Sequence, residues 1–273
     1  MSMWERALLL WERASLLWER PSLLWERASL AIFSCLVLAA ASLPVANAQP
    51  AAPAPTPRAA AALDLTGYWV AVVTEDWKFR MVTPNAGAYA GIPLNAAGRR
   101  VADAWDPARD KAAGEACKAY GAASIMRVPG RLHVTWENDA TLRINTDAGE
   151  QTRLLHFDAA ATPGEATWQG HSVAKWRPVV WRAAEDSPNG GGLEVVTTGM
   201  RSGYLRKNGV PYSENAMLTE YFNRFTAPNG DEWLVVTTIV DDPTYLNRPY
   251  VTSSNFKQLP DAAGFNPTPC SAT

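Results

Sequence analysis

The feature that most constrains the fold is a series of short segments rich in Val, Thr, Trp and Tyr, which begins near Leu63 and is interrupted by Gly, Pro and Asn. Residues 131–137 show the pattern most clearly, since apolar residues alternate there with more polar ones. Leu132, Val134 and Trp136 would share one face of a strand. Short segments of this composition, bounded by turn-forming residues, indicate β-strands.

Similar segments recur along most of the chain. The expected strands cover residues 67–75, 131–137, 142–146, 151–157, 167–176, 193–198, 216–225 and 232–240. Asn229 and Gly230 separate the last two, and an Asn-Gly pair readily adopts the positive φ angles that a tight hairpin requires. Eight or more short strands with few helices predict a mainly β fold, either a single antiparallel β-barrel or a sandwich.

Two short helices are expected near residues 95–118. Asn95 can cap a helix that begins at Ala96, and Asp106 followed by Pro107 is a typical N-cap with proline in the first helical turn. We expect this pair of helices to cover one end of the barrel or one face of a sheet.

The N-terminal part of the chain is predicted to lie outside the β domain. Residues 29–48 combine preceding arginines, an apolar run and the sequence Ala46-Asn47-Ala48, which is the order of a secretory signal peptide and its cleavage site. The apolar run is short for a membrane span, so no stable membrane insertion is expected after cleavage. The mature protein is therefore predicted to be periplasmic or secreted.

Two further segments flank the signal. Residues 1–28 contain Trp-Glu-Arg four times with a period of seven, and we interpret them as an extended n-region or translated repetitive DNA. An amphipathic or coiled-coil helix is the alternative interpretation. Residues 49–62 are rich in Pro and Ala and predict an extended, disordered linker. A single β-barrel-like domain would then occupy residues 63–273.

The cysteines and the net charge indicate the redox compartment and the kind of partner. Cys35 would leave with the signal peptide, and Cys117 and Cys270 would remain as a pair in an oxidising compartment. They predict a disulfide that holds the C-terminal tail against the domain, with two free thiols as the alternative. The formal net charge of −2 and the absence of a basic cluster argue against a nucleic-acid partner.

Gly67, Tyr68 and Trp69 at the start of the first expected strand resemble the G-x-W signature of lipocalin-like barrels. In those barrels the Trp packs across the closed end and the Gly lets the chain enter at a sharp angle. The resemblance implies a lipocalin-like barrel and specifies no ligand, because one fold supports many functions.

From residue 63 to about residue 270 the chain is also similar to a family of uncharacterised exported bacterial β-proteins. The similarity is carried by WQGHSVAKW at 168–176, LEVVTT at 193–198, NGVPYSE at 208–214, TEYFNR at 219–224 and DDPTY at 241–245. Residues 177–192 form a longer insert than the family pattern has. The resemblance implies export and a β fold, and it implies no reaction.

A binding function is the first of two hypotheses, in which a monomeric barrel holds a small apolar or amphipathic ligand in its interior. The expected interior residues are the aromatic Trp69, Trp136, Trp176, Tyr221 and Trp233 with the polar Glu220 and Arg224. Small barrels can also be filled by side chains, so the alternative is that these aromatic residues form a solid core.

An enzymatic function is the second hypothesis, namely a small-molecule hydrolase or isomerase. His171 and Ser172 fall in a sequence that partly matches the G-x-S-x-G nucleophile motif, with Ala174 in place of the last glycine. Glu220 and Arg224 would assist them. Adjacent strand residues point to opposite faces, so another histidine would have to serve Ser172 as its base.

A metal site is the last possibility. His133, His156 and His171 are the three histidines of the chain and fall on different expected strands. Three strand-borne histidines could converge on zinc or iron in a barrel. Their spacing contains no close pair, so no metal and no other cofactor is predicted.

Overall fold

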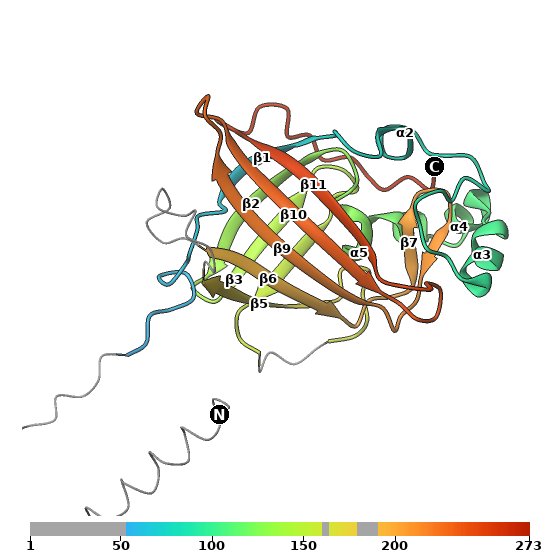
Figure 1. Cartoon of the computed structure of the whole chain (residues 1–273), viewed down its shortest axis with the longest axis horizontal. Helices are drawn as coiled ribbons and strands as arrows, with labels where there is room; N and C mark the ends of the chain where they lie inside the picture. The colour runs from blue at the N-terminus through green and yellow to red at the C-terminus, as the bar shows by residue number, and fades with distance from the viewer. Residues whose placement is uncertain (1–52, 160–163, 179–190) are drawn as a thin grey trace, which may run out of the picture. The chain divides into compact units, whose positions relative to one another are not determined.

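Nine strands among the described residues close into a barrel, and a group of short helices lies at one end of it (Figure 1). The computed structural model describes residues 53–159, 164–178 and 191–273, and those from Ala54 onward form one compact unit. The repeat, the signal peptide and its cleavage site, all predicted within residues 1–48, lie outside the described residues.

The order of strands around the ring is β1-β11-β10-β9-β6-β5-β4-β3-β2. The bounds are β1 Gly67–Val72, β2 Arg131–Asn138, β3 Thr141–Thr146, β4 Thr152–His156, β5 His171–Pro178, β6 Gly191–Thr198, β9 Met217–Thr226, β10 Glu232–Asp241 and β11 Tyr250–Leu259. Each of the eight expected strands is present within a few residues of its predicted position. The predicted fold class, a mainly β protein with one barrel, is confirmed.

One neighbouring pair in the ring is parallel. β4 and β5 pair with Leu155 opposite Ser172 and His156 opposite Val173, whereas the other pairs in the barrel are antiparallel. A ring with an odd number of strands cannot alternate in direction all the way round, so at least one pair must be parallel. The connection between β4 and β5 spans residues 157–170, a length that parallel neighbours need.

The ninth strand, β11, was not expected from the sequence. It pairs with β10 on one side and with β1 on the other, and thereby closes the barrel. Its centre contains Ser253, Ser254 and Asn255, which have low strand propensity. Ser254 is nevertheless fully buried, so neighbouring strands and not local composition determine this element.

The two predicted helices are present, and both begin at the predicted caps. The side chain of Asn95 accepts a hydrogen bond from Gly98 N at the start of α3 (Ala96–Asp103), and that of Asp106 accepts from Ala108 N at the start of α4 (Pro107–Ala112). α4 ends earlier than expected. The chain continues through the 3₁₀ helix η2 (Ala116–Tyr120) and the short α5 (Ala122–Ile125).

These helices cover one end of the barrel together with a separate hairpin, as Figure 1 shows on its right-hand side. The hairpin consists of β7 (Gly203–Arg206) and β8 (Val210–Tyr212). The short helix α2 (Trp77–Arg80) follows β1 and lies near the same end. The expectation that helices cover an end of the barrel is therefore met.

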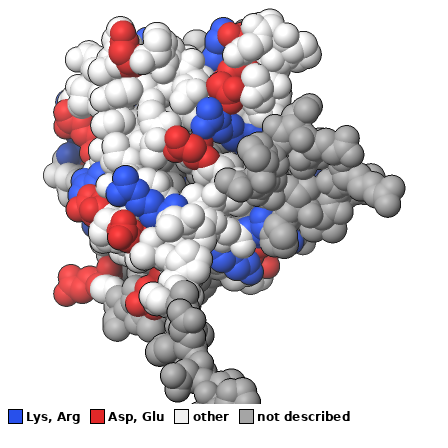
Figure 2. Space-filling model, turned by 90° about the vertical axis from the view of Figure 1, so that its left-hand side faces the viewer, with Lys and Arg blue, Asp and Glu red and all other residues white. Residues whose placement is uncertain are grey.

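The Pro/Ala-rich segment contacts the opposite end of the barrel. Pro57 O accepts a hydrogen bond from Trp176 Nε1 at 2.8 Å, and Arg58 N donates to Asp139 O at 3.0 Å. The described part of the expected linker, residues 53–62, therefore contacts the barrel at Pro57 and Arg58. Figure 2 views this end, where basic and acidic side chains are interspersed and form pairs such as Lys257–Asp231.

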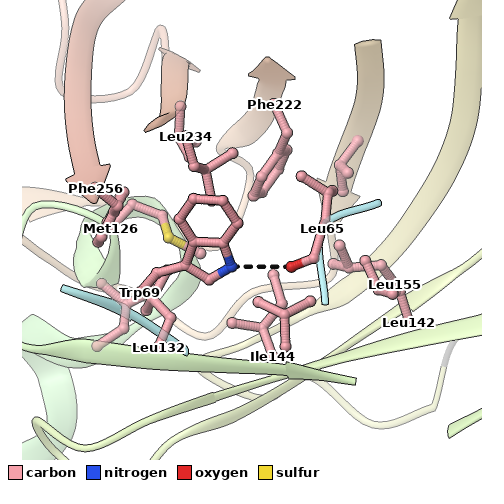
Figure 3. Packing of buried hydrophobic residues seen from close by; sticks show 14 of the residues in the cluster. Leu65, Trp69, Met126, Leu132, Leu142, Ile144, Leu155, Phe222, Leu234 and Phe256 are labelled. Carbon is pink, nitrogen blue, oxygen red and sulfur yellow. Dashed lines mark hydrogen bonds between the residues drawn. The ribbon is translucent and has the colours of Figure 1, made fainter. Parts of the chain in front are cut away.

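The interior of the barrel is filled by side chains. Trp69 is 0% exposed, and its Nε1 donates to Leu65 O at 2.9 Å (Figure 3). Fully buried Phe222 and Phe256 from β9 and β11 belong to the same cluster. The G-x-W tryptophan therefore lies in a solid core, and its polar atom is satisfied by a backbone carbonyl.

Cys117 and Cys270 lie at disulfide distance, with their sulfurs 1.98 Å apart, so the predicted pairing is confirmed. The bond joins η2 to the C-terminal tail across a separation of 153 residues. Within the described ranges, no helix has the length and apolar character needed to cross a membrane.

Candidate functional site

Glu220, one of the two polar residues expected inside the barrel, belongs to a buried ion pair. Arg153 on β4 donates through Nη2 to Glu220 Oε2 at 2.6 Å and through Nη1 to Glu220 Oε1 at 3.1 Å, and both side chains are 0% exposed. Arg153 Nη2 also lies 3.4 Å from Thr197 Oγ1. Glu220 therefore faces a structural partner that the sequence analysis did not identify. Arg224 contacts Glu232 and Asp64 near the opposite end of the barrel.

The expected aromatic lining separates into an inner and an outer group. Trp69 lies in the core, and Trp136 and Trp176 pack against the same cluster together with Phe157, with ring centroids 5.6 and 5.1 Å from Phe157. Tyr221 and Trp233 lie on the outer face of the barrel, because they alternate with the buried residues of β9 and β10. The structure does not bring these five aromatic residues together around one interior site.

The wall of the barrel separates His171 from Ser172. Ser172 faces the interior, is 2% exposed and lies within hydrogen-bonding distance of Thr197 Oγ1, at 2.7 Å. His171 is on the outer face and stacks on His156, with ring centroids 5.3 Å apart. A histidine on the outside cannot take a proton from a hydroxyl on the inside. The residues of the hydrolase hypothesis are therefore not assembled.

The third histidine lies elsewhere on the outer surface. His133 stacks on Tyr68 at 4.1 Å and contacts the edge of Phe265. Burial lowers the pKa of His133, and burial followed by the nearby His171 lowers the pKa of His156. Among the residues that the structure describes, no three potential metal ligands form a group.

A pocket lies instead at the helix-covered end. It has a volume of about 440 Å³ and is bounded by α3, the segment that follows it and the β7–β8 hairpin. Four aromatic side chains line it, namely Trp105, Tyr204, Tyr212 and Tyr245. Arg100, Arg109 and Lys118 also line it, and the described lining contains neither a carboxylate nor a histidine.

Close backbone packing creates this pocket. Gly98 allows α3 to approach the loop after β10, since a Cβ at Gly98 would lie 2.5 Å from Tyr245 O. Gly209 has φ +78°, and a Cβ there would lie 2.3 Å from the Trp105 side chain. Both sites need glycine, and Trp105 thereby packs closely against the turn of the hairpin.

Trp105 contributes a free hydrogen-bond donor. Its Nε1 atom is buried and has no partner in the structure, although a buried indole N–H normally finds one. Such an unpaired donor costs about 1–3 kcal/mol.

The opposite wall is held by a charged network. Tyr204 donates its hydroxyl to Asp110 Oδ2 at 2.7 Å, and Lys118 Nζ contacts Asp110 Oδ1 at 3.0 Å. Burial, reinforced by Asp110, raises the pKa of Tyr204 well above its ordinary range. Burial opposes the charge of Lys118, but its bonds to Glu115 and Asp110 outweigh that effect and raise its pKa. This wall is therefore fixed in one protonation state near neutral pH.

The sequence analysis did not assign these pocket residues a binding role. Tyr204 and Tyr245 lie on segments whose contact depends on the tertiary fold. The one available signal was the grouping of Tyr204, Tyr212 and Tyr245 around two glycine- or proline-containing turns.

Comparisons with protein-family models, curated proteins and solved structures found no match to this chain. The similarities to exported β-proteins and to lipocalin-like barrels therefore stay predictions.

Proposed function

We propose that this chain is an exported, monomeric binding protein that holds a small amphipathic molecule. The ligand would occupy the pocket between α3 and the β7–β8 hairpin, since the barrel interior is filled by its own side chains. The observation that carries the proposal is an aromatic pocket of about 440 Å³, and Trp105 in its lining has a hydrogen-bond donor without a partner. Small-molecule sites typically combine about 300–1,000 Å³ of mainly apolar surface with a few polar groups.

The lining indicates what such a ligand would look like. A flat apolar body would pack against Tyr204 and Tyr245, and an acceptor atom would receive the Trp105 N–H. The cations Arg100, Arg109 and Lys118 favour a ligand whose polar end is electron-rich or negatively charged.

The same lining favours binding over catalysis. General acid–base chemistry needs a group whose pKa lies near the working pH, and histidines and carboxylates are the usual candidates. The described lining has neither, and the pKa values of Tyr204 and Lys118 are both raised. His171, Ser172, Glu220 and Arg224 lie on both sides of the barrel wall or in ion pairs, so no observation favours the hydrolase or isomerase alternative.

The export part of the proposal rests on the cysteine pair. Disulfides persist in oxidising compartments, and Cys117 and Cys270 lie at bonding distance. Cell fractionation tests it, with the protein expected in the periplasm or medium. Accumulation of the full chain in the cytosol with two free thiols would contradict export.

Titration with 8-anilinonaphthalene-1-sulfonate, an amphipathic aromatic anion, tests the binding site. We expect saturable fluorescence that Ala104→Trp abolishes, because Ala104 is an exposed lining residue and a large ring there fills the pocket. Trp105→Phe keeps the ring and removes the donor, so affinity should fall about fivefold, the equivalent of one net hydrogen bond.

Trp77→Phe is the matched control, because Trp77 is 59% exposed on α2 and does not line the pocket. It should leave the probe's Kd unchanged. Absence of saturable binding, or equal affinity in the wild type and Ala104→Trp, would refute this site.

A further inference from the structure

A second pocket, of about 310 Å³, lies on the other side of the β7 strand. Its lining comes from α2, the segment that follows α5, and the end of β7. Four cationic residues line it, namely Arg80, Arg127, Arg206 and Lys207, and the described lining contains no carboxylate. Such a concentration of one sign of charge in a hollow attracts anions.

The three arginines of this pocket are nine-tenths buried or more. Arg80 is 9% exposed, Arg127 7% and Arg206 6%. Charges removed from water to this degree need compensation by opposite charges and by hydrogen bonds. The contacts within the protein show how far that compensation goes.

Two carboxylates outside the lining compensate part of the charge. Arg80 donates through Nη1 to Glu75, and Arg127 donates through Nη2 to Asp76 Oδ2 at 2.8 Å. Arg206 donates to two backbone carbonyls, Ala88 O and Ala90 O, each at 3.1 Å. Carbonyl oxygens carry no formal charge, so Arg206 has no counter-ion among these contacts.

The arginines also retain unused donors. Arg80 Nη2 and Arg127 Nη1 are buried and have no hydrogen-bond partner. Arg80 Nε meanwhile donates to Arg127 O at 2.9 Å, which holds the two residues side by side. Neighbouring guanidinium groups with free N–H edges match the geometry of a carboxylate or phosphate group.

The pKa directions agree with an electropositive site. Burial, followed by the nearby cation of Arg127, lowers the pKa of Arg80 against the opposing effect of Glu75. Burial likewise lowers the pKa of Arg206 against the opposing effects of Tyr250 and Asp76, and Arg127 adds to the lowering. A bound anion would relieve both.

The remaining walls are apolar. Phe79 stacks on Arg206, with the guanidinium carbon 4.2 Å from the ring centroid, and Val128 and Leu205 also line the pocket. Met81 and Val82 at the rim are 59% and 68% exposed. The site therefore has room for an apolar group attached to an anion.

We propose that this pocket is an oxyanion-binding site, in which the guanidinium groups of Arg80, Arg127 and Arg206 and the Lys207 ammonium group hold a carboxylate, phosphate or sulfate group. It is a separate site from the aromatic pocket, and it does not depend on the function proposed for that pocket.

Titration calorimetry with inorganic phosphate, sulfate, acetate and octanoate, at constant ionic strength in chloride, tests the proposal. We expect saturable binding of at least one of these oxyanions. Tighter octanoate than acetate would assign the site to carboxylates on an apolar chain, whereas preference for phosphate or sulfate would assign it to tetrahedral anions. No saturable binding of any of the four would overturn the proposal.

Variants locate the site. Arg127→Lys keeps the charge beside Asp76 but loses the planar fork, and we expect the Kd to rise about tenfold, as for loss of a charge-assisted hydrogen bond. Lys207→Gln should weaken binding about threefold through the lost charge alone, which corresponds to an exposed charge pair. Lys207 is only partly buried, so this variant keeps the test valid if the arginine variant does not fold.

Lys175→Gln and Trp105→Phe are the matched controls. Lys175 is exposed on the outer face of β5, and Trp105 lines the other pocket. Both should bind the oxyanion as the wild type does. Equal affinity in the wild type, Arg127→Lys and Lys207→Gln would show that the anion binds elsewhere and would overturn the assignment.

Discussion

Replacement of Glu220 by Gln is expected to destabilise the barrel strongly, because it leaves the Arg153 guanidinium charged and without a counter-ion in the interior. Removal of one partner from a buried ion pair typically costs about 3–5 kcal/mol. Both side chains are 0% exposed, so Arg153 cannot turn its charge toward water without opening the barrel. We therefore expect Glu220→Gln to lower the free energy of unfolding by about 3–5 kcal/mol.

The structure narrows the origin of this cost. Gln has nearly the shape of Glu, so no cavity forms and the packing around residue 220 is preserved. Its amide oxygen can still accept one hydrogen bond from Arg153, and Thr197 Oγ1 lies 3.4 Å from Arg153 Nη2. What is lost is the negative charge and one of two short contacts, at 2.6 and 3.1 Å. Arg153 Nε already lacks a hydrogen-bond partner, so the variant would leave a further donor of the same guanidinium group unsatisfied.

Urea unfolding followed by tryptophan fluorescence measures the effect on Glu220→Gln, Arg153→Met and the double variant. Met removes the buried cation, so the double variant should cost about 2–3 kcal/mol less than the sum of the single variants. Glu137→Gln at the exposed pair with Arg143 is the control and should not change the unfolding midpoint measurably. A loss below about 1 kcal/mol for Glu220→Gln, or additive single effects, would refute the reasoning.

Two further predictions concern the disulfide and pH. The double variant Cys117→Ser/Cys270→Ser should lower the free energy of unfolding by up to about 4–5 kcal/mol, because the bond closes a long loop in the unfolded chain; equal urea midpoints for the variant and the oxidised wild type would contradict this. His156 has a pKa below its ordinary value of 6.5 in the folded state, from burial and then from His171, so the unfolded chain binds more protons. The free energy of unfolding should therefore be retained above pH 6.5 and decrease as the pH falls from there toward the folded pKa. His156→Gln should make the free energy of unfolding depend less on pH in this range. An unchanged pH dependence in the variant would contradict this prediction.

The alternation of residue types was sufficient to place most of the barrel. Leu132, Val134 and Trp136 alternate with polar residues, and β2 follows that pattern with the apolar face inside. Turn residues such as Asn229 and Gly230 fixed the β9–β10 hairpin in the same way. These features are local, because side-chain period and turn geometry are properties of a few consecutive residues.

Features that depend on distant partners were missed. The faces of residues 218–225 both mix polar and apolar side chains, because Glu220 inside the barrel is matched by Arg153 on a strand far away in the chain. Tyr221 and Trp233 were wrongly assigned to the interior, because the residue types on β9 and β10 do not reveal which face of each strand is inside. β11 was missed because its polar centre is buried by β1 and β10.

The sequence analysis identified neither of the two pockets. Each is enclosed by segments that meet only in the folded domain, such as α3 with the loop at Tyr245, or α2 with the end of β7. The signals that identify them are unpaired donors on Trp105, Arg80 and Arg127. An unpaired donor is a property of the assembled structure, because every donor is satisfied by water in the unfolded chain.

The pairing of β1 with β11 has a kinetic consequence. Tyr68 lies opposite Leu259, so the ring becomes complete only when two segments from opposite ends of the domain meet. Topologies dominated by such distant pairings fold slowly, on a scale of about milliseconds to seconds. During synthesis the barrel stays open at this seam until its last strand emerges, which would keep the chain unfolded for the export proposed above.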